Sequence, residues 1–319
     1  MSKEYGKQVK DYELLQILGE GSYGCVWKAV DKHSGEVVAI KKFMDLDFDR
    51  TSWKDCLNSR EVKALRDLDH PNIVKLKQII VENYALYLVM ECMDMTLTEL
   101  IKKSKVKKSS IMDQVRGITV QLFEALAHMH ERGYFHRDLK PDNILVSDNI
   151  VKVADFGMAR EVSMTGGKLY TDRVTTLWYR APEVLVKPSL YGPAVDMWAM
   201  GAIMAELFSS MPLFRGSNNV DQYDGVDNLP KLVPNADEDA ISLIRWLCSW
   251  DDRKRPTALE ALQHPFFASH YSIPKSIHEI RLSSLEDCSS SRLAWGFSKL
   301  WELVKSVACI CGMRKKCIN

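Results

Sequence analysis

The stretch His136-Arg137-Asp138-Leu139-Lys140-Pro141-Asp142-Asn143 decides how the rest of this chain is interpreted. It brings acidic, basic and amide side chains together between an apolar helical pattern and the strand-like Ile144-Leu145-Val146. A second acidic stretch, Asp155-Phe156-Gly157, follows twelve residues beyond Asn143. Polar side chains that cluster at the ends of apolar segments indicate a catalytic site.

The side chains of these two stretches suit phosphate chemistry. Asn143 and Asp155 offer two oxygen ligands, and Mg²⁺ commonly takes few protein ligands and completes its coordination with substrate phosphates and water. Asp138 could then accept a hydroxyl proton, and Lys140 could neutralise charge on a phosphoryl group in transfer.

A glycine-rich stretch lies near the N-terminus, where Gly19-Glu20-Gly21-Ser22-Tyr23-Gly24-Cys25-Val26 has the form G-x-G-x-x-G-x-V. Alone this pattern is weak, because glycines also serve ordinary tight turns. A dinucleotide-binding loop would lead into a helix, but here a strand is predicted from Cys25 to Val30. The glycines are therefore expected at the tip of a hairpin, where backbone N–H groups could cover phosphates.

Lys41 stands fifteen residues beyond Val26, in the apolar run Val38-Ala39-Ile40-Lys41. A lysine in an apolar strand is costly unless it is paired. A phosphate and a carboxylate would pair it, and Glu61 on the following predicted helix is the candidate carboxylate.

The pattern along the chain predicts an α+β fold. The first 90 residues are strand-rich, with one helix expected from Trp53 to Leu68 and a strand pair at Ile73 to Val81 and Tyr84 to Glu91. Beyond Met93 the apolar spacing is helical. Four helices are expected there, with one ending near Gly133 and the others over Val195 to Ser209, Asp237 to Ser249 and Ala258 to His264. A β-rich part followed by a helical part can hold a ligand between them.

Composition excludes several classes of protein. Lys plus Arg number 43 and Asp plus Glu 42, so the formal charge of +1 does not fit a strongly basic nucleic-acid binder, and no nucleic acid is expected as a partner. Eight Cys in 319 residues are too sparse for a disulfide scaffold. The charged N-terminus lacks the apolar core of a signal peptide, so an intracellular protein of cytoplasm or nucleus is expected. The basic run from 102 to 110 is interpreted as a solvated loop in preference to a nuclear signal.

The chain resembles the eukaryotic protein kinases, because it carries their motifs in the same order. These motifs are the glycine-rich loop, VAIK, HRDLKPDN, DFG and Ala181-Pro182-Glu183. The resemblance covers residues 12–268 and implies a bilobal kinase fold. It divides the chain into an N-terminal extension (1–11), a β-rich N-lobe (12–92), a helical C-lobe (93–268) and a C-terminal tail (269–319).

The branch can be narrowed by shorter stretches. Trp178-Tyr179-Arg180 and Asn58-Ser59-Arg60-Glu61 resemble the cyclin-dependent and mitogen-activated kinase group (CMGC). Four further stretches resemble the male-germ-cell-associated kinase branch, particularly its plant members. These are Arg60-Glu61-Val62-Lys63-Ala64-Leu65, Gly133-Tyr134-Phe135-His136, Glu91-Cys92-Met93-Asp94 and Leu247-Cys248-Ser249-Trp250-Asp251.

The resemblance implies an ATP- and Mg²⁺-dependent serine/threonine kinase and assigns roles. Asp138 would deprotonate the substrate hydroxyl beside Lys140, Lys41 would hold phosphates and pair with Glu61, and Asn143 and Asp155 would hold Mg²⁺. ATP contacts would come from Leu18, Gly19, Glu20, Gly21, Ser22, Tyr23, Gly24, Val26, Ala39, Lys41, Met90 as gatekeeper, Glu91, Met93 and Leu145. For Leu18, Val26, Ala39 and Leu145, plain core packing stays open as well. An ion pair between Glu183 and Arg255 is implied, and Asp196 would brace the catalytic loop.

Regulation is also implied. Thr171 aligns with the threonine phosphorylated in this group, and Arg60, Arg137 and Arg160 stand where the family gathers arginines around that phosphate. Arg173 breaks the branch's Thr-x-Tyr pattern, so single-site control by an upstream kinase is expected. Val174, Thr176 and Arg180 match the segment that accepts a proline after the phospho-acceptor, which implies protein substrates with Ser/Thr-Pro sites.

Two departures support an alternative. Only 59 positions separate Asp196 from Arg255, several tens fewer than in this kinase group, which indicates a deletion near 222–226 that leaves apolar surface uncovered. The apolar, cysteine-containing tail suits either a membrane or partner helix or, as the favoured interpretation, a product of splicing or of an erroneous gene model. An ATP-binding but catalytically impaired isoform, acting as a binding or decoy module, is therefore the alternative to an active kinase.

Overall fold

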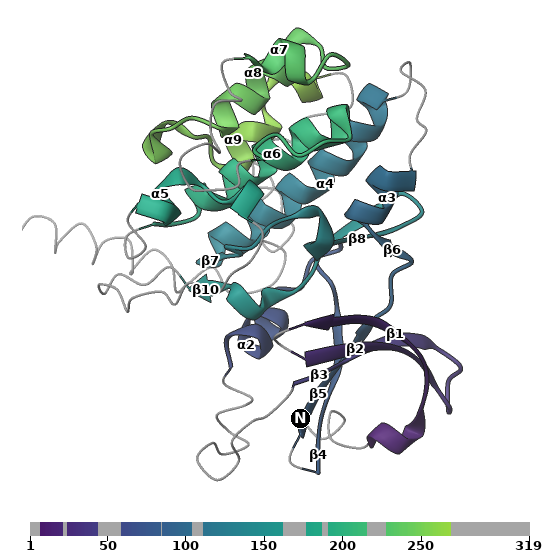
Figure 1. Ribbon diagram of the computed structural model, residues 1–319. Coiled ribbons are helices and arrows are strands. Elements are labelled where there is room, and N and C mark those ends of the chain that lie inside the picture. The colour runs from purple at the N-terminus through teal and green to yellow at the C-terminus, as the bar shows by residue number, and fades with distance from the viewer. Residues whose placement is uncertain are drawn as a thin grey trace, which may run out of the picture. The chain divides into compact units, whose positions relative to one another are not determined.

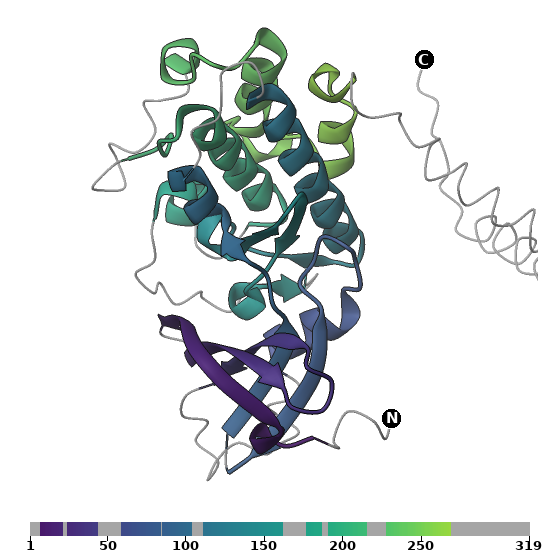
Figure 2. The same ribbon diagram turned by 90° about the vertical axis from the view of Figure 1, so that its right-hand side faces the viewer.

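The computed structural model describes residues 7–21, 24–43, 59–83, 85–103, 111–161, 177–186, 191–215 and 228–268. Within these ranges the strands gather in one part and most of the helices in another (Figures 1 and 2), which is the bilobal α+β arrangement expected from the sequence. The tail from 269 and the proposed deletion near 222–226 lie outside the described residues.

The N-lobe is built on one five-stranded antiparallel sheet with the strand order β1-β2-β3-β5-β4. The strands are β1 (Tyr12–Gly21), β2 (Gly24–Asp31), β3 (Val37–Lys42), β4 (Leu76–Glu82) and β5 (Ala85–Glu91). Side chains from all five strands form a buried core cluster of Tyr12, Ala29, Val38, Ile40, Ile80 and Val89. Burial of alternate residues along paired strands holds the sheet together.

Helix α2 (Arg60–Asp67) is shorter in the described residues than the expected helix from Trp53 to Leu68, because residues 53–58 lie outside them. Its apolar face of Val62, Ala64 and Leu65 is buried, and so is Glu61. The expected strand from Ile73 begins only at Leu76. Ile73 instead makes an isolated bridge to Val153, a pairing between the lobes that periodicity alone does not reveal.

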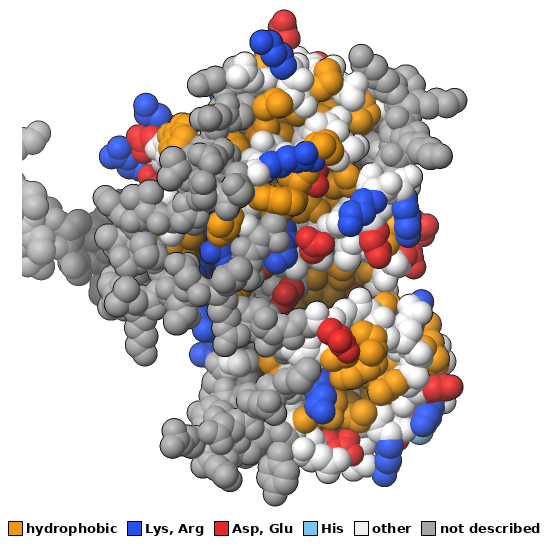
Figure 3. Space-filling model, in the orientation of Figure 1, with side chains coloured by type: hydrophobic (Ala, Val, Ile, Leu, Met, Phe, Trp, Pro, Cys, Tyr) orange, Lys and Arg blue, Asp and Glu red, His pale blue; other side chains and the backbone are white. Residues whose placement is uncertain are grey.

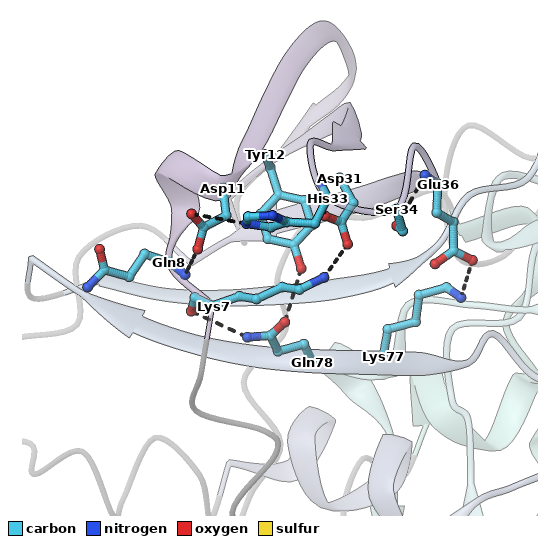
Figure 4. Close-up of polar contacts among 10 residues, drawn as sticks. All are labelled: Lys7, Gln8, Asp11, Tyr12, Asp31, His33, Ser34, Glu36, Lys77 and Gln78. Atoms are coloured by element: carbon cyan, nitrogen blue, oxygen red, sulfur yellow. Dashed lines mark hydrogen bonds and ion pairs between the residues drawn. The ribbon is translucent and has the colours of Figure 1, made fainter.

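Residues before β1 are bonded to the sheet, as Figure 4 shows. The Lys7 ammonium forms an ion pair with Asp31 at the end of β2, and the side-chain amide of Gln78 donates to the Lys7 carbonyl (3.3 Å). The Tyr12 hydroxyl donates to Gln78 Oε1 at 3.0 Å. A short 3₁₀ turn, Val9–Asp11, follows Lys7 and leads into β1. These contacts hold residues 7–11 against the outer part of the N-lobe.

The C-lobe is helical. Its α-helices are α3 (Leu97–Lys103), α4 (Ile111–Glu131), α5 (Pro182–Val186), α6 (Ala194–Ser209), α7 (Leu229–Leu232), α8 (Glu238–Leu247) and α9 (Ala258–Leu262). Short strands join it as the pair β10 (Arg160–Glu161) with β7 (Tyr134–Phe135), and as the sheet β6 (Met95–Thr96), β8 (Ile144–Ser147) and β9 (Ile150–Val153). The remaining 3₁₀ turns are Pro141–Asn143, Phe156–Met158, Leu177–Tyr179, Asp252–Lys254 and Pro265–Phe267.

Helix α6 is the centre of the C-lobe. Nearly all of its residues are buried, as expected for a helix that is apolar on every side. A Cβ atom added at Gly201 would lie 2.5 Å from the Sγ of Cys248, which follows α8, so the two helices meet at a glycine. Among the described residues, no helix combines the length and apolarity needed to cross a membrane.

Candidate active site

The catalytic loop lies between β7 and β8 and presents the carboxylate of Asp138. Lys140 Nζ lies 2.8 Å from Asp138 Oδ2, and Asn143 Nδ2 lies 3.1 Å from the same oxygen. Asn143 Nδ2 also donates to the Asp138 carbonyl at 2.8 Å. One acid, one ammonium and one amide therefore meet at a single point. The resemblance implies Lys140 beside Asp138, and the structure adds the contact with Asn143.

Asp196 supports this loop from the first turn of α6. Its Oδ2 accepts the backbone N–H of His136 (2.8 Å) and its Oδ1 accepts that of Arg137 (2.8 Å). Arg137 has φ 74°, a costly backbone conformation for a residue with a side chain, and the Asp196 contact helps to hold it. The resemblance implies this bracing role for Asp196. Nothing in the sequence points to His130 on α4, whose Nε2 lies 3.0 Å from Asp196 Oδ2.

Burial alone would raise the pKa of Asp196, which is 1% exposed. The contact with His130 and the two backbone donors outweigh burial and lower the pKa of this carboxyl. The group is therefore an anion, which is the form that accepts hydrogen bonds from the loop.

Lys41 on β3 is shared by two carboxylates. Its Nζ lies 2.7 Å from Glu61 Oε1 on α2 and 2.9 Å from Asp155 Oδ1, which follows β9. The lysine and Glu61 side chains are 8% and 4% exposed, while that of Asp155 is 37% exposed. The pairing with Glu61 matches the expectation from the sequence, and the geometry adds Asp155 as a second partner.

These three groups influence each other's protonation. Burial lowers the pKa of Lys41, but the two carboxylates outweigh burial and raise it, so the lysine is a cation. Burial also raises the pKa of Glu61, which Lys41 only partly offsets. For Asp155, burial raises the pKa, but Lys41 outweighs burial and lowers it. The site therefore holds a fixed positive charge next to an ionised Asp155.

The glycine-rich stretch forms the tip of the β1–β2 hairpin, where Gly21 pairs with Gly24, as predicted. Gly24 has φ 132°, and a Cβ atom there would lie 1.8 Å from the Lys42 carbonyl oxygen on β3. The close approach of β3 therefore requires a glycine at position 24, whether or not a ligand binds there. Ser22 and Tyr23 lie outside the described residues, and Glu20 and Gly19 lie on β1.

The residues expected around the adenine lie on five strands and on the segment after β5. Ala39 pairs with Met90 across β3 and β5, Val26 lies on β2, and Leu145 lies on β8. Ala39 is buried, so core packing describes it as well. Leu18 is 46% exposed on β1, where hydrophobic side chains gather on the outer face of the N-lobe (Figure 3), so core packing does not describe it.

Glu91 ends β5, and Met93 follows two residues later. The Glu91 side chain accepts the backbone N–H of Lys75 at 2.7 Å and lies 2.8 Å from Lys152 Nζ on β9. These contacts tie the connection between the lobes to both lobes. Lys152 is absent from the roles that the sequence implies.

Asn143 and Asp155 fit a divalent cation that is shared with a substrate. The backbone N–H of Ala154 donates to the Asn143 carbonyl at 2.9 Å, which sets Asn143 beside the chain that carries Asp155. Within the described ranges, no group of three or more His, Cys, Asp or Glu side chains could hold a metal. An amide oxygen and a carboxylate, completed by phosphates, are a donor set for a hard cation.

The structure describes the three arginines proposed to bind a phosphate but not the threonine proposed to carry it. Thr171 lies outside the described residues, together with Val174 and Thr176. Arg160 on β10 pairs with Phe135 on β7, close in sequence to Arg137. Arg137 donates to the Met158 carbonyl at 3.2 Å and to the Tyr191 hydroxyl at 3.0 Å from Nε. Arg60 is exposed at the start of α2. Tyr191 was not singled out by sequence analysis, because the two residues lie 54 positions apart.

A pocket adjoins the catalytic loop on the side of α5 and α6. Its lining includes Asp138, Lys140, Tyr179, Arg180 and Val184. Arg180 therefore lines the same pocket as Asp138, the proposed base. The implied ion pair behind this pocket is present, since Arg255 Nη1 lies 2.6 Å from Glu183 Oε1.

Comparison with known proteins agrees with this geometry. The model of the protein kinase domain matches residues 12–267. Cyclin-dependent kinase F-3 of Oryza sativa subsp. japonica is 42% identical over 320 residues, a match that covers 90% of this chain and 72% of the rice protein. Serine/threonine-protein kinase MAK of Mus musculus is 40% identical over 302 residues, covering 84% of this chain and 47% of the mouse protein.

A third relative, serine/threonine-protein kinase ICK of Rattus norvegicus, is 41% identical over 288 residues, covering 80% of this chain and 45% of the rat protein. The chain thus spans about half the length of the MAK and ICK relatives and more of the rice protein. The matched region holds every predicted catalytic residue. The chain belongs to the protein kinase family and, within it, to the ATP-dependent serine/threonine kinases of the cyclin-dependent and MAK-like group.

Proposed function

We propose that this protein transfers the γ-phosphate of ATP to serine and threonine hydroxyls that precede proline, and that phosphorylation of Thr171 activates it. The observation that carries the proposal is the meeting of Lys140 and Asn143 on the carboxylate of Asp138, 2.8 and 3.1 Å away. The two donors fix the position of this carboxylate, and Asp138 and Arg180 line the same pocket.

The chain's own residues then have separate tasks. Asp138 accepts the proton of the substrate hydroxyl, and Lys140 offsets negative charge at the same point. Lys41, held by Glu61, orients the nucleotide phosphates. Asn143 and Asp155 would hold Mg²⁺, which when bound supplies charge neutralisation to the phosphates.

The regulatory part of the proposal rests on charge. A phosphate on Thr171 would carry about −1.5 to −2 charge. Arg160 near the start of the activation segment pairs with Phe135, two residues before Arg137, which supports a role for both arginines. Arginines suit phosphate because they can bind it through two parallel N–H groups. An upstream kinase is the partner that this proposal requires.

Transfer of radiolabelled phosphate by the purified protein tests the proposal, with a Ser-Pro peptide and a matched Ser-Ala peptide as substrates. Asp138→Asn is expected to lose about 10²–10⁴-fold in rate, the usual contribution of a general base. Thr171→Ala is expected to lower activity, whereas Thr165→Ala in the same segment is the matched control. Equal transfer to both peptides would overturn proline direction, and equal rates for the two threonine variants would overturn control at Thr171.

The second candidate function, an ATP-binding module without efficient transfer, is favoured by the span of 59 positions between Asp196 and Arg255. It predicts a folded wild-type protein that binds nucleotide but transfers nothing, even after treatment with an activating kinase. The intact contacts of Asp196 and Arg255 favour the active enzyme.

A further inference from the structure

The hydroxyl of Tyr134 connects strand β7, on which the residue lies, with helix α2 and strand β10. Tyr134 lies on β7, two residues before His136. Its hydroxyl lies 2.6 Å from Asp67 Oδ2, at the end of α2, and 3.2 Å from Glu161 Oε1, on β10. The tyrosine is 6% exposed, and its backbone pairs with that of Glu161 between β7 and β10.

The Tyr134 hydroxyl can donate its hydrogen bond to only one of the two carboxylates at a time. A phenol has one proton, so it donates to one carboxylate at a time, and the shorter contact marks Asp67 as the acceptor. Rotation of the same proton makes Glu161 the alternative acceptor. Burial and the two carboxylates raise the pKa of Tyr134, so the hydroxyl remains a donor at physiological pH.

The position of Asp67 gives the contact its importance. Helix α2 has only eight residues, and its first turn carries Glu61, which holds Lys41. The other end of the helix is Asp67. A helix this short moves largely as one body, so a bond at Asp67 restricts where Glu61 can lie.

The position of Glu161 adds the second half of the link. β10 is the first strand after Phe156–Met158 and leads toward Thr171. A rearrangement that moves β10 away from β7 changes the place of Glu161 relative to the Tyr134 hydroxyl. The hydroxyl is therefore shared between the helix that positions Glu61 and the start of the segment proposed to be regulated.

We propose that Tyr134 is a positioning residue that couples the start of the activation segment to helix α2, and through it to the Lys41–Glu61 pair. The inference rests on the phosphotransfer of the proposed function, and it requires neither control at Thr171 nor proline direction. Tyr134 touches neither substrate nor the reacting atoms, and its effect passes through α2.

The test compares Tyr134→Phe with Tyr12→Phe. Each variant removes one hydroxyl from a buried tyrosine, but the Tyr12 hydroxyl bonds to Gln78 in the N-lobe and has no described contact with α2. A hydrogen bond to a charged group corresponds to roughly a tenfold change in an equilibrium constant. Tyr134→Phe is therefore expected to raise the KM for ATP about five- to tenfold, with the KM for peptide unchanged. Tyr12→Phe is expected to leave both constants at their wild-type values.

Hydrogen exchange of the amides of residues 60–67 in the nucleotide-free protein gives a readout that does not depend on activity. Exchange there is expected to accelerate in Tyr134→Phe and in Asp67→Ala, but not in Tyr12→Phe. In a double variant with Glu161→Gln, the effects on the KM for ATP are expected to be non-additive.

Unchanged exchange in α2 together with an unchanged KM for ATP in Tyr134→Phe would overturn the inference. A wild-type protein without phosphotransfer would overturn the proposed function instead, and the exchange measurement would still decide the role of Tyr134. A thermal melt identifies any variant that fails to fold, in which case Asp67→Ala supplies the same comparison.

Discussion

Arg255 holds both carboxylate oxygens of Glu183. Its Nη1 lies 2.6 Å from Oε1 and its Nη2 lies 2.8 Å from Oε2, while the arginine side chain is fully buried. The remaining guanidinium hydrogens reach the carbonyls of Ser249 (2.8 Å), Ala194 (3.0 Å) and Trp250 (3.5 Å). One side chain therefore ties α5 to the start of α6 and to the turn after α8.

Loss of this arginine is expected to be severe. Arg255→Ala leaves the Glu183 carboxylate without its partner, and breaking a buried pair in this way costs about 3–5 kcal/mol of unfolding free energy. Arg255→Lys keeps the charge but not the two-pronged geometry, so an intermediate loss is expected. Urea denaturation measures both. A lysine variant as stable as the wild type would show that charge alone suffices.

Glu61→Gln is expected to weaken catalysis more than folding. The amide oxygen can still accept from Lys41, but the negative charge that keeps the lysine in place is gone. Removal of a buried charge also lowers its desolvation cost, so the melting temperature should change little. Steady-state assays are expected to show a loss in kcat/KM of about tenfold, since an ion pair becomes a hydrogen bond from the Lys41 ammonium to a neutral amide. Lys41→Met, which removes both contacts, should lose more, and equal losses would contradict this order.

Two glycines of the same hairpin are expected to respond differently to alanine. Gly24→Ala places a Cβ atom 1.8 Å from the Lys42 carbonyl oxygen at a φ of 132°, so strain of at least about 1–3 kcal/mol is expected. Gly19→Ala has no neighbour within 4 Å and no positive φ, so the fold should tolerate it. Thermal melts of both variants, with nucleotide titrations, make the comparison. Equal melting temperatures would contradict the geometry.

The Lys7–Asp31 contact predicts a pH-dependent part of stability. The hydrogen bond from Lys7 lowers the pKa of Asp31 from 3.8 to about 2. Because the folded pKa is depressed, the stabilisation is complete above pH 3.8 and is lost as the pH falls toward about 2. Lys7 is 37% exposed, so the contribution is about 1 kcal/mol at most.

Urea denaturation of the wild type and Asp31→Asn at several pH values checks this dependence. The difference in unfolding free energy between them is expected to shrink as the pH falls from 4 toward 2. A difference that stays constant would show that the Asp31 carboxylate gains nothing from Lys7 in the folded state.

The sequence predicts best the contacts whose residues lie in ordered motifs. Lys41 with Glu61, Asp196 with the catalytic loop, and Glu183 with Arg255 all follow from motif order, because each motif has a fixed place in the family fold. Apolar periodicity likewise predicts α6 and α8 to within a few residues.

Contacts between segments that meet only in the folded chain could not be predicted. His130 reaches Asp196 across 66 positions, and Tyr134 reaches Asp67 across 67. Neither has a local pattern, since a histidine or tyrosine on a helix or strand is equally typical of ordinary packing. The sequence around Gly24 likewise does not reveal that a Cβ atom is excluded there, because the Lys42 carbonyl that excludes it lies on a different strand.

The meeting of Gly201 with Cys248 has a consequence for how this protein can change over generations. The Cβ atom of any side chain at 201 would lie 2.5 Å from the Cys248 sulfur and 3.0 Å from the Leu247 Cβ, so these neighbours would have to move. A smaller residue at 248 removes the shorter of the two contacts. Positions 201 and 248 are therefore expected to vary together, with the reduction at 248 easing the later enlargement at 201.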